Sequence, residues 1–270
     1  MVRMVCRYLL LAVFCTGLAR AQAPATKSGV TDQQKVQEVA GKLVGQQHAW
    51  DEAAATSATK LIFKEKSRKK AEQGTVITYE LSAPDLPKDR HYTLMAWPLN
   101  RAIEPVRGGI TLNAEGRLVC TGKTPADCTT KPGDDPTIDI ALQFAKGEAK
   151  RFALISDDQK SKALATVVAF PIIGKDAGCL LEALLGTPDG EVALIIGSGF
   201  PPSTGVPMSS DSAGEVSTGV WQVNAKGELA SMVLPQVRGK TSGDTTVFLK
   251  SPACAPKISF HWGKGTYHVE

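Results

Sequence analysis

The stretch GSGFPPST, residues 197–204, follows the apolar run EVALII, residues 191–196, and decides between two kinds of fold. Glycines directly after an apolar run are typical of a loop that holds phosphate, and equally of a turn that ends a strand in a β-sandwich. A phosphate loop needs a lysine at a fixed spacing and a helix after it. This stretch has no lysine, and Pro201-Pro202 disfavours a helix there. We therefore expect a strand turn, with Phe200 entering the core.

Short runs rich in Val, Ile, Thr, Tyr and Phe dominate the chain from Leu61 onward, and turn residues separate them. This spacing predicts an all-β sandwich or barrel, and no strand–helix–strand rhythm indicates a parallel sheet. The predicted strands of the first half are residues 61–66, 75–81, 91–99, 108–112, 116–120, 137–144, 150–156 and 165–172. Those of the second half are residues 191–197, 217–223, 228–234, 245–250 and 257–262.

An internal echo divides these strands into two similar halves. The frame N-A-x-G-x-L occurs at residues 113–118 and again at residues 224–229. In both places alternating apolar residues flank a turn whose glycine can adopt a positive φ, so we expect two hairpins. A change of composition at residues 172–177 marks the boundary. We predict two β-sandwich domains, residues 59–174 and 175–270.

The pattern around residues 190–250 resembles the immunoglobulin-like modules of secreted bacterial proteins. In that family a strand is followed by G-x-G-F-x-P, and a later Asn or Asp turn (here residues 224–227) and a final stretch such as residues 243–247 recur. The resemblance implies two tandem immunoglobulin-like β-sandwich domains. It also implies a protein that binds, spaces or displays rather than catalyses, although a fold alone does not assign a function.

The N-terminal segment, residues 1–23, is typical of a secretory signal peptide. Arg3 and Arg7 precede an apolar core that is too short to span a bilayer, and small-x-small cleavage sites follow. We therefore expect a secreted or periplasmic protein without a membrane span. This segment holds three of the 31 Lys and Arg residues, so the remainder is close to neutral beside 27 Asp and Glu. The charge therefore does not indicate nucleic-acid binding.

Residues 24–58 are predicted to form a linker and a short helix. Thr31 and Gln34 fit a capping box, and apolar residues recur at helical spacing up to Val44. The predicted helix covers about residues 32–46 and precedes the two sandwiches. It would dock on the body of the protein or on a neighbouring one.

Four of the six cysteines lie outside the predicted signal peptide, and an even number in an exported chain favours disulfides. The pairing that we favour is Cys120–Cys128, across a short turn-rich loop, with Cys179–Cys254 joining the two ends of the second domain. Two other pairings are open. The histidines are scattered and no C-x-x-C occurs, so neither a metal site nor a cofactor is expected.

No catalytic motif is evident in the sequence. Ser198 and Ser242 do not sit in a nucleophile elbow, and the run at residues 116–124 misses a phosphate-loop motif by one residue. His91, His261 and His268 have no motif around them. Asp134, Asp135 and Asp139 could supply clustered oxygen ligands to calcium, but their spacing does not fit an EF-hand loop. We therefore name no catalytic, cofactor-binding or metal-binding residue.

Two residue patterns have a structural and a functional interpretation. Trp97, Trp221 and Trp262 lie in predicted strands and either pack in the core or form a flat platform for sugar rings, which would require exposed tryptophans. The basic run KEKSRKK, residues 64–70, is either a solvated hairpin face or a patch for an anionic envelope polymer.

The first functional hypothesis is a non-enzymatic exported protein that binds an unknown protein or glycan of the cell envelope. Its surface would be loops at a sandwich end, or a sheet edge to which a partner strand adds. The alternative is a hydrolase of an envelope polymer with a site at the domain junction. That enzyme would need a cleft that brings His91 or His261 to a carboxylate. A third hypothesis is a structural subunit that assembles through the helix.

Overall fold

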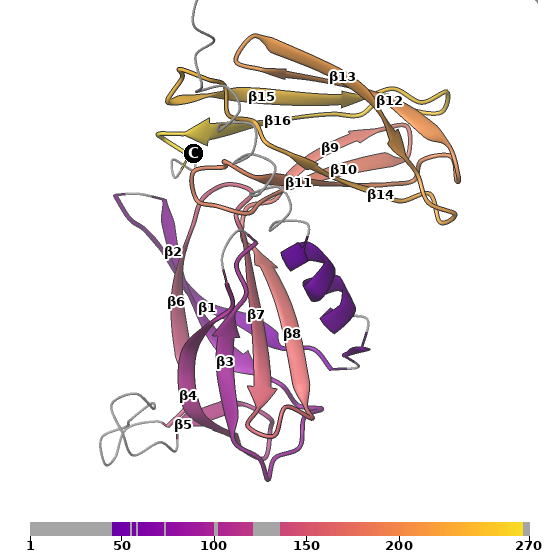
Figure 1. The fold of residues 1–270 in the computed structure, drawn as a ribbon. Coiled ribbons are helices and arrows are strands. Elements are labelled where there is room, and N and C mark those ends of the chain that lie inside the picture. Colours follow the sequence, from indigo (N-terminus) through magenta and orange to yellow (C-terminus); the bar gives the residue numbers. More distant parts are fainter. Residues whose placement is uncertain are drawn as a thin grey trace, which may run out of the picture. The chain divides into compact units, whose positions relative to one another are not determined.

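A computed structural model describes residues 45–266, apart from residues 55, 58, 73, 100–101 and 121–135. This part of the chain contains sixteen β-strands and one helical segment, and all pairings between the named strands are antiparallel. The described residues belong to one compact unit, Ala40–Glu270. The predicted all-β class is confirmed (Figure 1).

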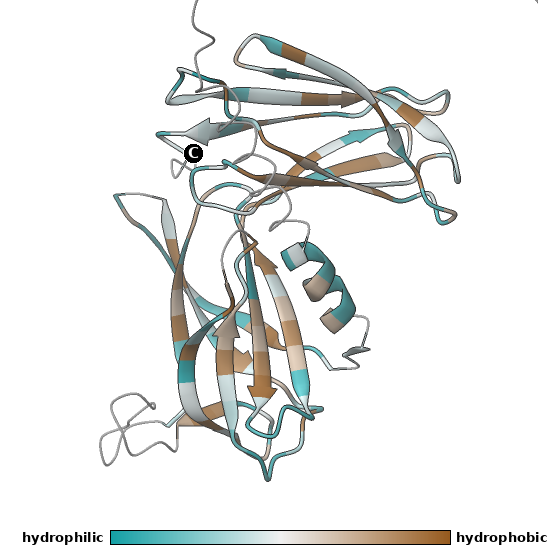
Figure 2. Ribbon diagram, in the orientation of Figure 1, coloured by the Kyte–Doolittle hydropathy of each residue, from teal (hydrophilic) through white to brown (hydrophobic). Residues whose placement is uncertain are grey.

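The strands of the first half form two sheets, with the orders β1-β2-β6 and β5-β4-β3-β7-β8 (Figure 1). Their bounds are β1 Ile62–Lys70, β2 Thr75–Ser82, β3 Tyr92–Ala96, β4 Glu104–Leu112, β5 Leu118–Cys120, β6 Asp139–Phe144, β7 Ala149–Ser156 and β8 Lys162–Val168. Side chains of both sheets meet in one core cluster, in which Ile77 of β2 and Leu154 of β7 are fully buried. Figure 2 shows the hydrophobic residues that β6 and β7 contribute.

The strands of the second half also form two sheets, with the orders β14-β11-β10-β9 and β13-β12-β15-β16. Their bounds are β9 Ile172–Asp176, β10 Cys179–Leu185, β11 Ala193–Ser198, β12 Gly205–Ser212, β13 Glu215–Gln222, β14 Leu229–Val233, β15 Ser242–Leu249 and β16 Lys257–Gly263. Leu181 of β10 and Val247 of β15 come from opposite sheets and are fully buried in a second core cluster. Strands β9, β10 and β12 were not among the predicted strands.

The apolar core divides close to the predicted domain boundary. Phe170 packs against the first cluster, and Ile172 is the first member of the second. Strand β9 starts at Ile172 and pairs with β10, so the second sandwich begins slightly before residue 175. The division into residues 59–174 and 175–270 remains a prediction at the level of domains.

The turn after β11 has the predicted strand-turn structure. Gly199 has a φ of 80°, and a Cβ at this position would lie 2.4 Å from the carbonyl oxygen of Gly178. Phe200 is 2% exposed and belongs to the second core. The segment that contains the two prolines then leads into β12, and the hydroxyl of Thr204 donates to the carbonyl of Pro201 at 2.7 Å.

The two N-A-x-G-x-L frames have the same local structure. The side-chain oxygen of Asn113 accepts hydrogen bonds from the backbone of Glu115 and Arg117, and that of Asn224 accepts them from Lys226 and Glu228. Both turns end in a glycine with a positive φ, 77° at Gly116 and 79° at Gly227. The side chain of asparagine replaces a backbone acceptor in each turn, which fixes the turn in both halves.

The prediction of two hairpins is wrong for the second frame. Strands β4 and β5 pair with each other around the first turn. Strand β13, however, pairs with β12, whereas β14 pairs with β11 in the opposite sheet. The same turn therefore closes a hairpin in the first sandwich and connects the two sheets of the second. Turn chemistry fixes the reversal of the chain, but it does not fix the partner of the next strand.

The helical segment occupies residues 45–54 in the described chain, so it continues beyond the predicted end at about residue 46. Most of the predicted helix, residues 32–44, lies outside the described residues. Trp50 packs edge-to-face against Trp97, with ring centroids 5.4 Å apart, and Arg151 stacks on the Trp50 ring. Gln47 accepts a hydrogen bond from the Arg151 guanidinium at 2.7 Å. The helix is thus docked on the outer face of β7.

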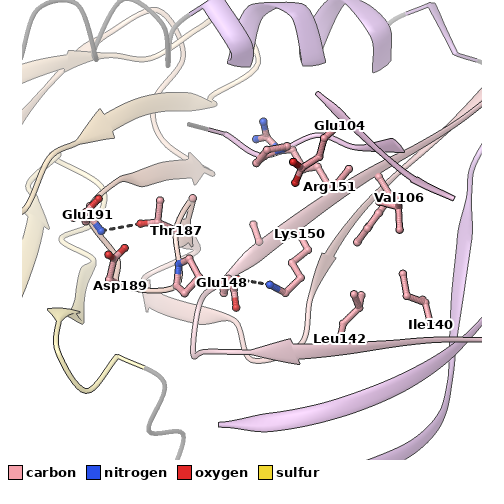
Figure 3. Close-up of a pocket in the computed structure, with 16 residues that line it drawn as sticks. Glu104, Val106, Ile140, Leu142, Glu148, Lys150, Arg151, Thr187, Asp189 and Glu191 are labelled. Carbon is pink, nitrogen blue, oxygen red and sulfur yellow. Dashed lines mark hydrogen bonds and ion pairs between the residues drawn. The ribbon is translucent and has the colours of Figure 1, made fainter. Parts of the chain in front are cut away.

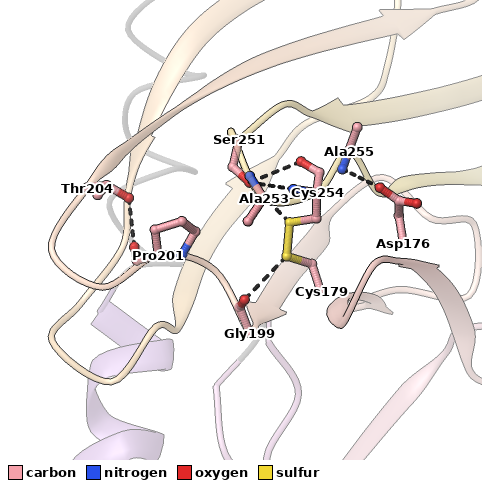
Figure 4. Close-up of a disulfide and its surroundings, with 9 residues drawn as sticks. All are labelled: Asp176, Cys179, Gly199, Pro201, Thr204, Ser251, Ala253, Cys254 and Ala255. Atoms are coloured by element: carbon pink, nitrogen blue, oxygen red, sulfur yellow. Dashed lines mark hydrogen bonds between the residues drawn. A yellow bond between two sulfur atoms is a disulfide. The ribbon is translucent and has the colours of Figure 1, made fainter.

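One predicted disulfide joins the two sheets of the second sandwich (Figure 4). Cys179 begins β10, and Cys254 lies between β15 and β16, 75 positions further along the chain, with the two Cα atoms 6.1 Å apart. The hydroxyl of Ser251 bonds the backbone of Cys254, which holds that loop. Cys120 ends β5, but Cys128 lies outside the described residues, so their pairing stays a prediction.

Candidate functional site

A cleft of about 450 Å³ is lined by both apolar and charged side chains (Figure 3). Val106 of β4 lies on one side of it, and Ile140 and Leu142 of β6 lie on the other. Its remaining walls come from the end of β3, from residues 148–152 at the start of β7, and from residues 186–191 between β10 and β11. We call this hollow the β4–β6 cleft.

Two strand edges border the β4–β6 cleft without a strand partner among the described residues. Strand β6 pairs only with β2, so its other edge is open. Strand β4 pairs with β5 only over Ile110–Leu112, so residues 104–108 have no strand partner on that side among the described residues. Pro105 fits an edge position, because proline has no N–H to donate to a neighbouring strand. Within the described part of the chain, the sandwich is thus open at this side.

A buried ion pair forms part of the cleft wall. The carboxylate of Glu148 is bound to the ammonium of Lys150, which also lies 5.4 Å from the centre of the Phe144 ring. Glu148 is 3% exposed and accepts a further hydrogen bond from the backbone of Ala145 at 3.0 Å. Because each charge has a partner, this pair is a fixed part of the wall rather than a free binding group.

The remaining charge of the cleft is mainly negative. Glu104, Asp189 and Glu191 line it in addition to the Glu148–Lys150 pair, and Arg151 is the one further cation among its lining residues. Gln236 donates to the carboxylate of Glu191, and the hydroxyl of Thr187 accepts from the Glu191 backbone, which fixes this side of the cleft. A ligand with an apolar group and a positive charge would match these walls.

Arg151 connects the cleft to the docked helix. Burial lowers the pKa of its guanidinium to about 10, against a smaller opposite effect of Asp51. One terminal nitrogen donates to Gln47, and the other, Nη1, has no hydrogen-bond partner among the described residues. The guanidinium is therefore occupied on one side by the helix and incompletely satisfied on the other.

A second hollow, of about 610 Å³, contains His261 and Asp244. The His261 Nδ1 lies 3.0 Å from a carboxylate oxygen of Asp244, and Nε2 lies 2.9 Å from the carbonyl oxygen of Lys264. Both partners are acceptors, so the imidazolium form, in which both ring nitrogens donate, satisfies both contacts. Burial lowers the pKa of His261, but the hydrogen bonds to Asp244 and Lys264 outweigh it and raise the pKa.

This geometry bears directly on the enzyme hypothesis. His261 does meet a carboxylate in a hollow, which is the feature that the hypothesis requires. Neither ring nitrogen is free to take a proton from a substrate, however, because Asp244 and Lys264 occupy them. Ser259, which lines the same hollow, shares its hydroxyl hydrogen bond with Thr246 at 2.8 Å. The described residues here are arranged as a structural link.

The other candidate residues are not brought together. His91 is exposed, and its carbonyl accepts from Asp157, whereas His268 lies outside the described residues. Asp134 and Asp135 also lie outside them, and Asp139 forms an ion pair with Lys66 at 2.7 Å. No cluster of His, Cys, Asp or Glu suited to a metal ion occurs within the described part of the chain.

The tryptophans do not form a sugar platform. Trp97 and Trp262 are buried, and Trp221 is partly buried against the second core. Trp97 follows β3 instead of lying within it, whereas Trp221 and Trp262 lie in β13 and β16 as predicted. The indole N–H of Trp262 donates to Ser212 at 3.1 Å. These side chains serve packing.

The basic run at residues 64–70 lies on β1, an exposed edge strand that forms a hairpin with β2. Arg68 binds Glu65 through two hydrogen bonds and lies over the Phe170 ring, and Lys66 pairs with Asp139. Neighbouring carboxylates therefore neutralise part of the run. This is the arrangement expected of a solvated hairpin.

Comparison with known proteins finds no protein-family model and no curated protein that matches this chain. Among the described residues, no helix has the length and hydrophobicity needed to cross a bilayer. The functional inference therefore rests on the geometry of the chain itself. Sequence patterns do not indicate the β4–β6 cleft, because its residues come from five separated segments and form no motif.

Proposed function

We propose that this protein is an exported, non-enzymatic binding protein of the bacterial envelope or exterior, built from immunoglobulin-like modules. The Cys179–Cys254 disulfide supports an oxidising compartment, as the N-terminal segment does. The hydroxyl of Tyr92 donates to the backbone carbonyl of Pro87 at 2.5 Å. A tyrosine that bonds back to the backbone a few residues upstream recurs in immunoglobulin-like sandwiches, so it supports the proposed modules.

The β4–β6 cleft is the proposed binding site, and its ligand is an extended segment of another protein. The observation that supports this proposal is a pair of strand edges, β6 and residues 104–108 of β4, that have no strand partner among the described residues and lie on either side of an apolar hollow. An extended segment can satisfy the N–H and C=O groups of an open edge, while pockets receive alternate side chains. Cleft and edges together therefore suit a strand better than a compact small molecule.

The walls define what such a segment should contain. An apolar side chain would fit between Val106 and Leu142, which lie on opposite sides of the cleft (Figure 3). A Lys or Arg would be favoured beside the carboxylates of Glu104 and Asp189. The charge would determine the orientation of the bound segment and the selectivity of binding more than the affinity.

A peptide selection tests this proposal. Immobilised, disulfide-intact residues 24–270 would be panned against a random peptide library, and the bound peptides sequenced. We expect enrichment of peptides with alternating apolar residues and at least one Lys or Arg. Their binding should be lost in Val106→Lys, which changes a 43% exposed side chain of the cleft.

Ile173→Lys is the matched control, because Ile173 is 47% exposed on β9 and does not line the cleft. Binding should survive in this variant. Enriched peptides that bind Val106→Lys as well as the native protein would refute the cleft as the site. Failure to enrich any sequence would refute peptide binding.

The enzyme alternative retains one specific observation, the hollow with His261 and Asp244. It predicts that the native protein hydrolyses an envelope polymer and that the His261→Gln variant does not. The hydrogen bonds to both ring nitrogens support a structural role instead.

A further inference from the structure

Strand β13 carries the two most exposed large hydrophobic residues of the described structure. Val216 and Val220 are 70% and 59% exposed, the highest values among its exposed large hydrophobic residues. Both lie on the same face, because side chains alternate along a strand. Strand β13 is the edge of its sheet, and only β12 pairs with it among the described strands.

The two long edge strands of the chain differ in their protection. Strand β1 carries five Lys and Arg residues, which are typical of an edge that avoids pairing with other chains. Strand β13, EVSTGVWQ, has no Lys, Arg or Pro, and Glu215 at its start is its one charged residue. An exposed edge of this kind is suited to association with another strand.

The backbone of β13 shows which groups are open. Val220 stands opposite Pro207 on β12, and the carbonyl of Pro207 accepts from Lys250, on the far side of β12 from β13. Proline has no N–H, so Val220 and Pro207 form a pair without mutual hydrogen bonds. The polar backbone groups of Val220 therefore point to the open edge. The direction of the backbone N–H and C=O groups alternates from one residue to the next along a strand. The groups of Val216 and Thr218 therefore point to the open edge as well.

We infer that β13 is a self-association edge, at which a second copy of this chain adds its own β13 antiparallel to the first. The two-fold axis passes between the Thr218 residues of the two copies. In this register Val216 of each copy stands opposite Val220 of the other, and the open backbone groups of both strands meet. The two four-stranded sheets join into one continuous sheet.

The side chains of β13 are compatible with this register. The two Val216–Val220 pairs bring together the most exposed apolar side chains of each copy, and a Thr–Thr pair lies between them. Cross-strand pairs of β-branched residues and of threonines stabilise antiparallel sheets. Glu215 faces Trp221 of the other copy, so no like charges stand opposite each other. The interface is isologous, as a two-fold dimer requires.

A cysteine placed at the two-fold axis tests the register. Thr218 is exposed, so Thr218→Cys should fold normally. The two Cα atoms of a directly opposed hydrogen-bonded pair lie about 5.5 Å apart, within the range of a disulfide. In Val216→Cys, the matched control, the two cysteines would be about 14 Å apart, from the usual rise per residue and the spacing between strands. Mild oxidation of the full mature chain should yield a covalent dimer with Thr218→Cys at least about tenfold faster than with Val216→Cys.

Sedimentation of the uncrosslinked protein gives an independent test. The native chain should show a concentration-dependent dimer, and Val216→Lys/Val220→Lys should stay monomeric because four ammonium groups would meet at the edge. Ile173→Lys should dimerise as the native protein does. A native protein that is monomeric from micromolar to millimolar concentration would overturn the inference, as would equal crosslinking rates for the two cysteine variants.

Discussion

The backbone N–H of Phe200 donates a hydrogen bond to the carbonyl oxygen of Gly227 at 3.1 Å, and this contact joins two turns that are distant in the sequence. The first sandwich contains the same arrangement, in which Ala83 donates to Gly116 at 2.8 Å. In each half, an asparagine turn ends in a glycine that lies against the end of an earlier strand. The internal echo of the sequence thus corresponds to a repeated contact between turns.

Gly227 should be intolerant of any side chain. A Cβ at this position would lie 2.6 Å from the carbonyl oxygen of Phe200, and the φ of 79° is itself unfavourable for alanine. We expect Gly227→Ala to lower the free energy of unfolding by about 2–3 kcal/mol. Urea denaturation followed by tryptophan fluorescence measures the change.

Gly239→Ala is the control for Gly227→Ala. Gly239 has a φ of 81°, but a Cβ there would meet nothing within 4 Å. The free energy of unfolding of this variant should fall by only about 1 kcal/mol, which is the cost of the backbone conformation alone. Equal losses in the two variants would show that the close approach to Phe200 contributes nothing.

Removal of the Cys179–Cys254 disulfide should destabilise the second sandwich. The bond closes a loop of 75 positions, and the chain-entropy model gives about 4 kcal/mol for a loop of this length. The double variant Cys179→Ser/Cys254→Ser should therefore unfold at a markedly lower denaturant concentration. A midpoint equal to that of the native protein under oxidising conditions would contradict the stabilising role.

The link between His261 and Asp244 should make stability depend on pH. The folded pKa of His261 is raised above its usual 6.5, so the stabilisation is fully present below about pH 6.5 and is lost as the pH rises through the folded pKa. Nuclear magnetic resonance titration of the imidazole measures this pKa. Asp244→Asn should lower it, and an unchanged titration would rule out the carboxylate as a cause.

Trp50 should hold the helix on the outer face of β7. It is buried between the Trp97 ring and the Arg151 guanidinium, so Trp50→Ala removes both contacts. We expect the free energy of unfolding to fall by about 3 kcal/mol, as is usual when a buried aromatic side chain is truncated to alanine. In the variant, limited proteolysis should cut within residues 45–54 earlier than it cuts within the two sandwiches. Protection equal to that of the native chain would show that the helix is held by other contacts.

Local chemistry made parts of this fold predictable. Gly199 and Phe200 in the turn after β11, and the Asn224 turn, have the structures that their residue types favour. Strand β10, CLLEALL, was not predicted, because its Leu, Ala and Glu residues are strong helix formers and several neighbouring side chains are buried, which hides the alternation. Strand β12 contains Pro207 and several serines, which have low strand propensity. It is held in the strand conformation by pairing with its two neighbours, β13 and β15.

The candidate site was less predictable than the fold for a physical reason. An open strand edge is a property of topology. In the described structure β5 pairs with β4 only from Ile110 onward, away from Val106, and β6 is the last strand in its sheet. Pro105 is compatible with such an edge, but a single proline does not identify it. His261 and Asp244 show the converse, because a plausible catalytic pair proved to be fully engaged in structural hydrogen bonds.

Hydrogen exchange in the presence of a selected peptide is the most direct test of the proposed binding function. A peptide that adds to the open edges should slow exchange of backbone amides in β6 and in residues 104–108, and should do so in Ile173→Lys but not in Val106→Lys. Protection confined to these edges is the result that we predict. Bound peptide with unchanged exchange at both edges, or with protection confined to other strands, would contradict strand addition in the β4–β6 cleft.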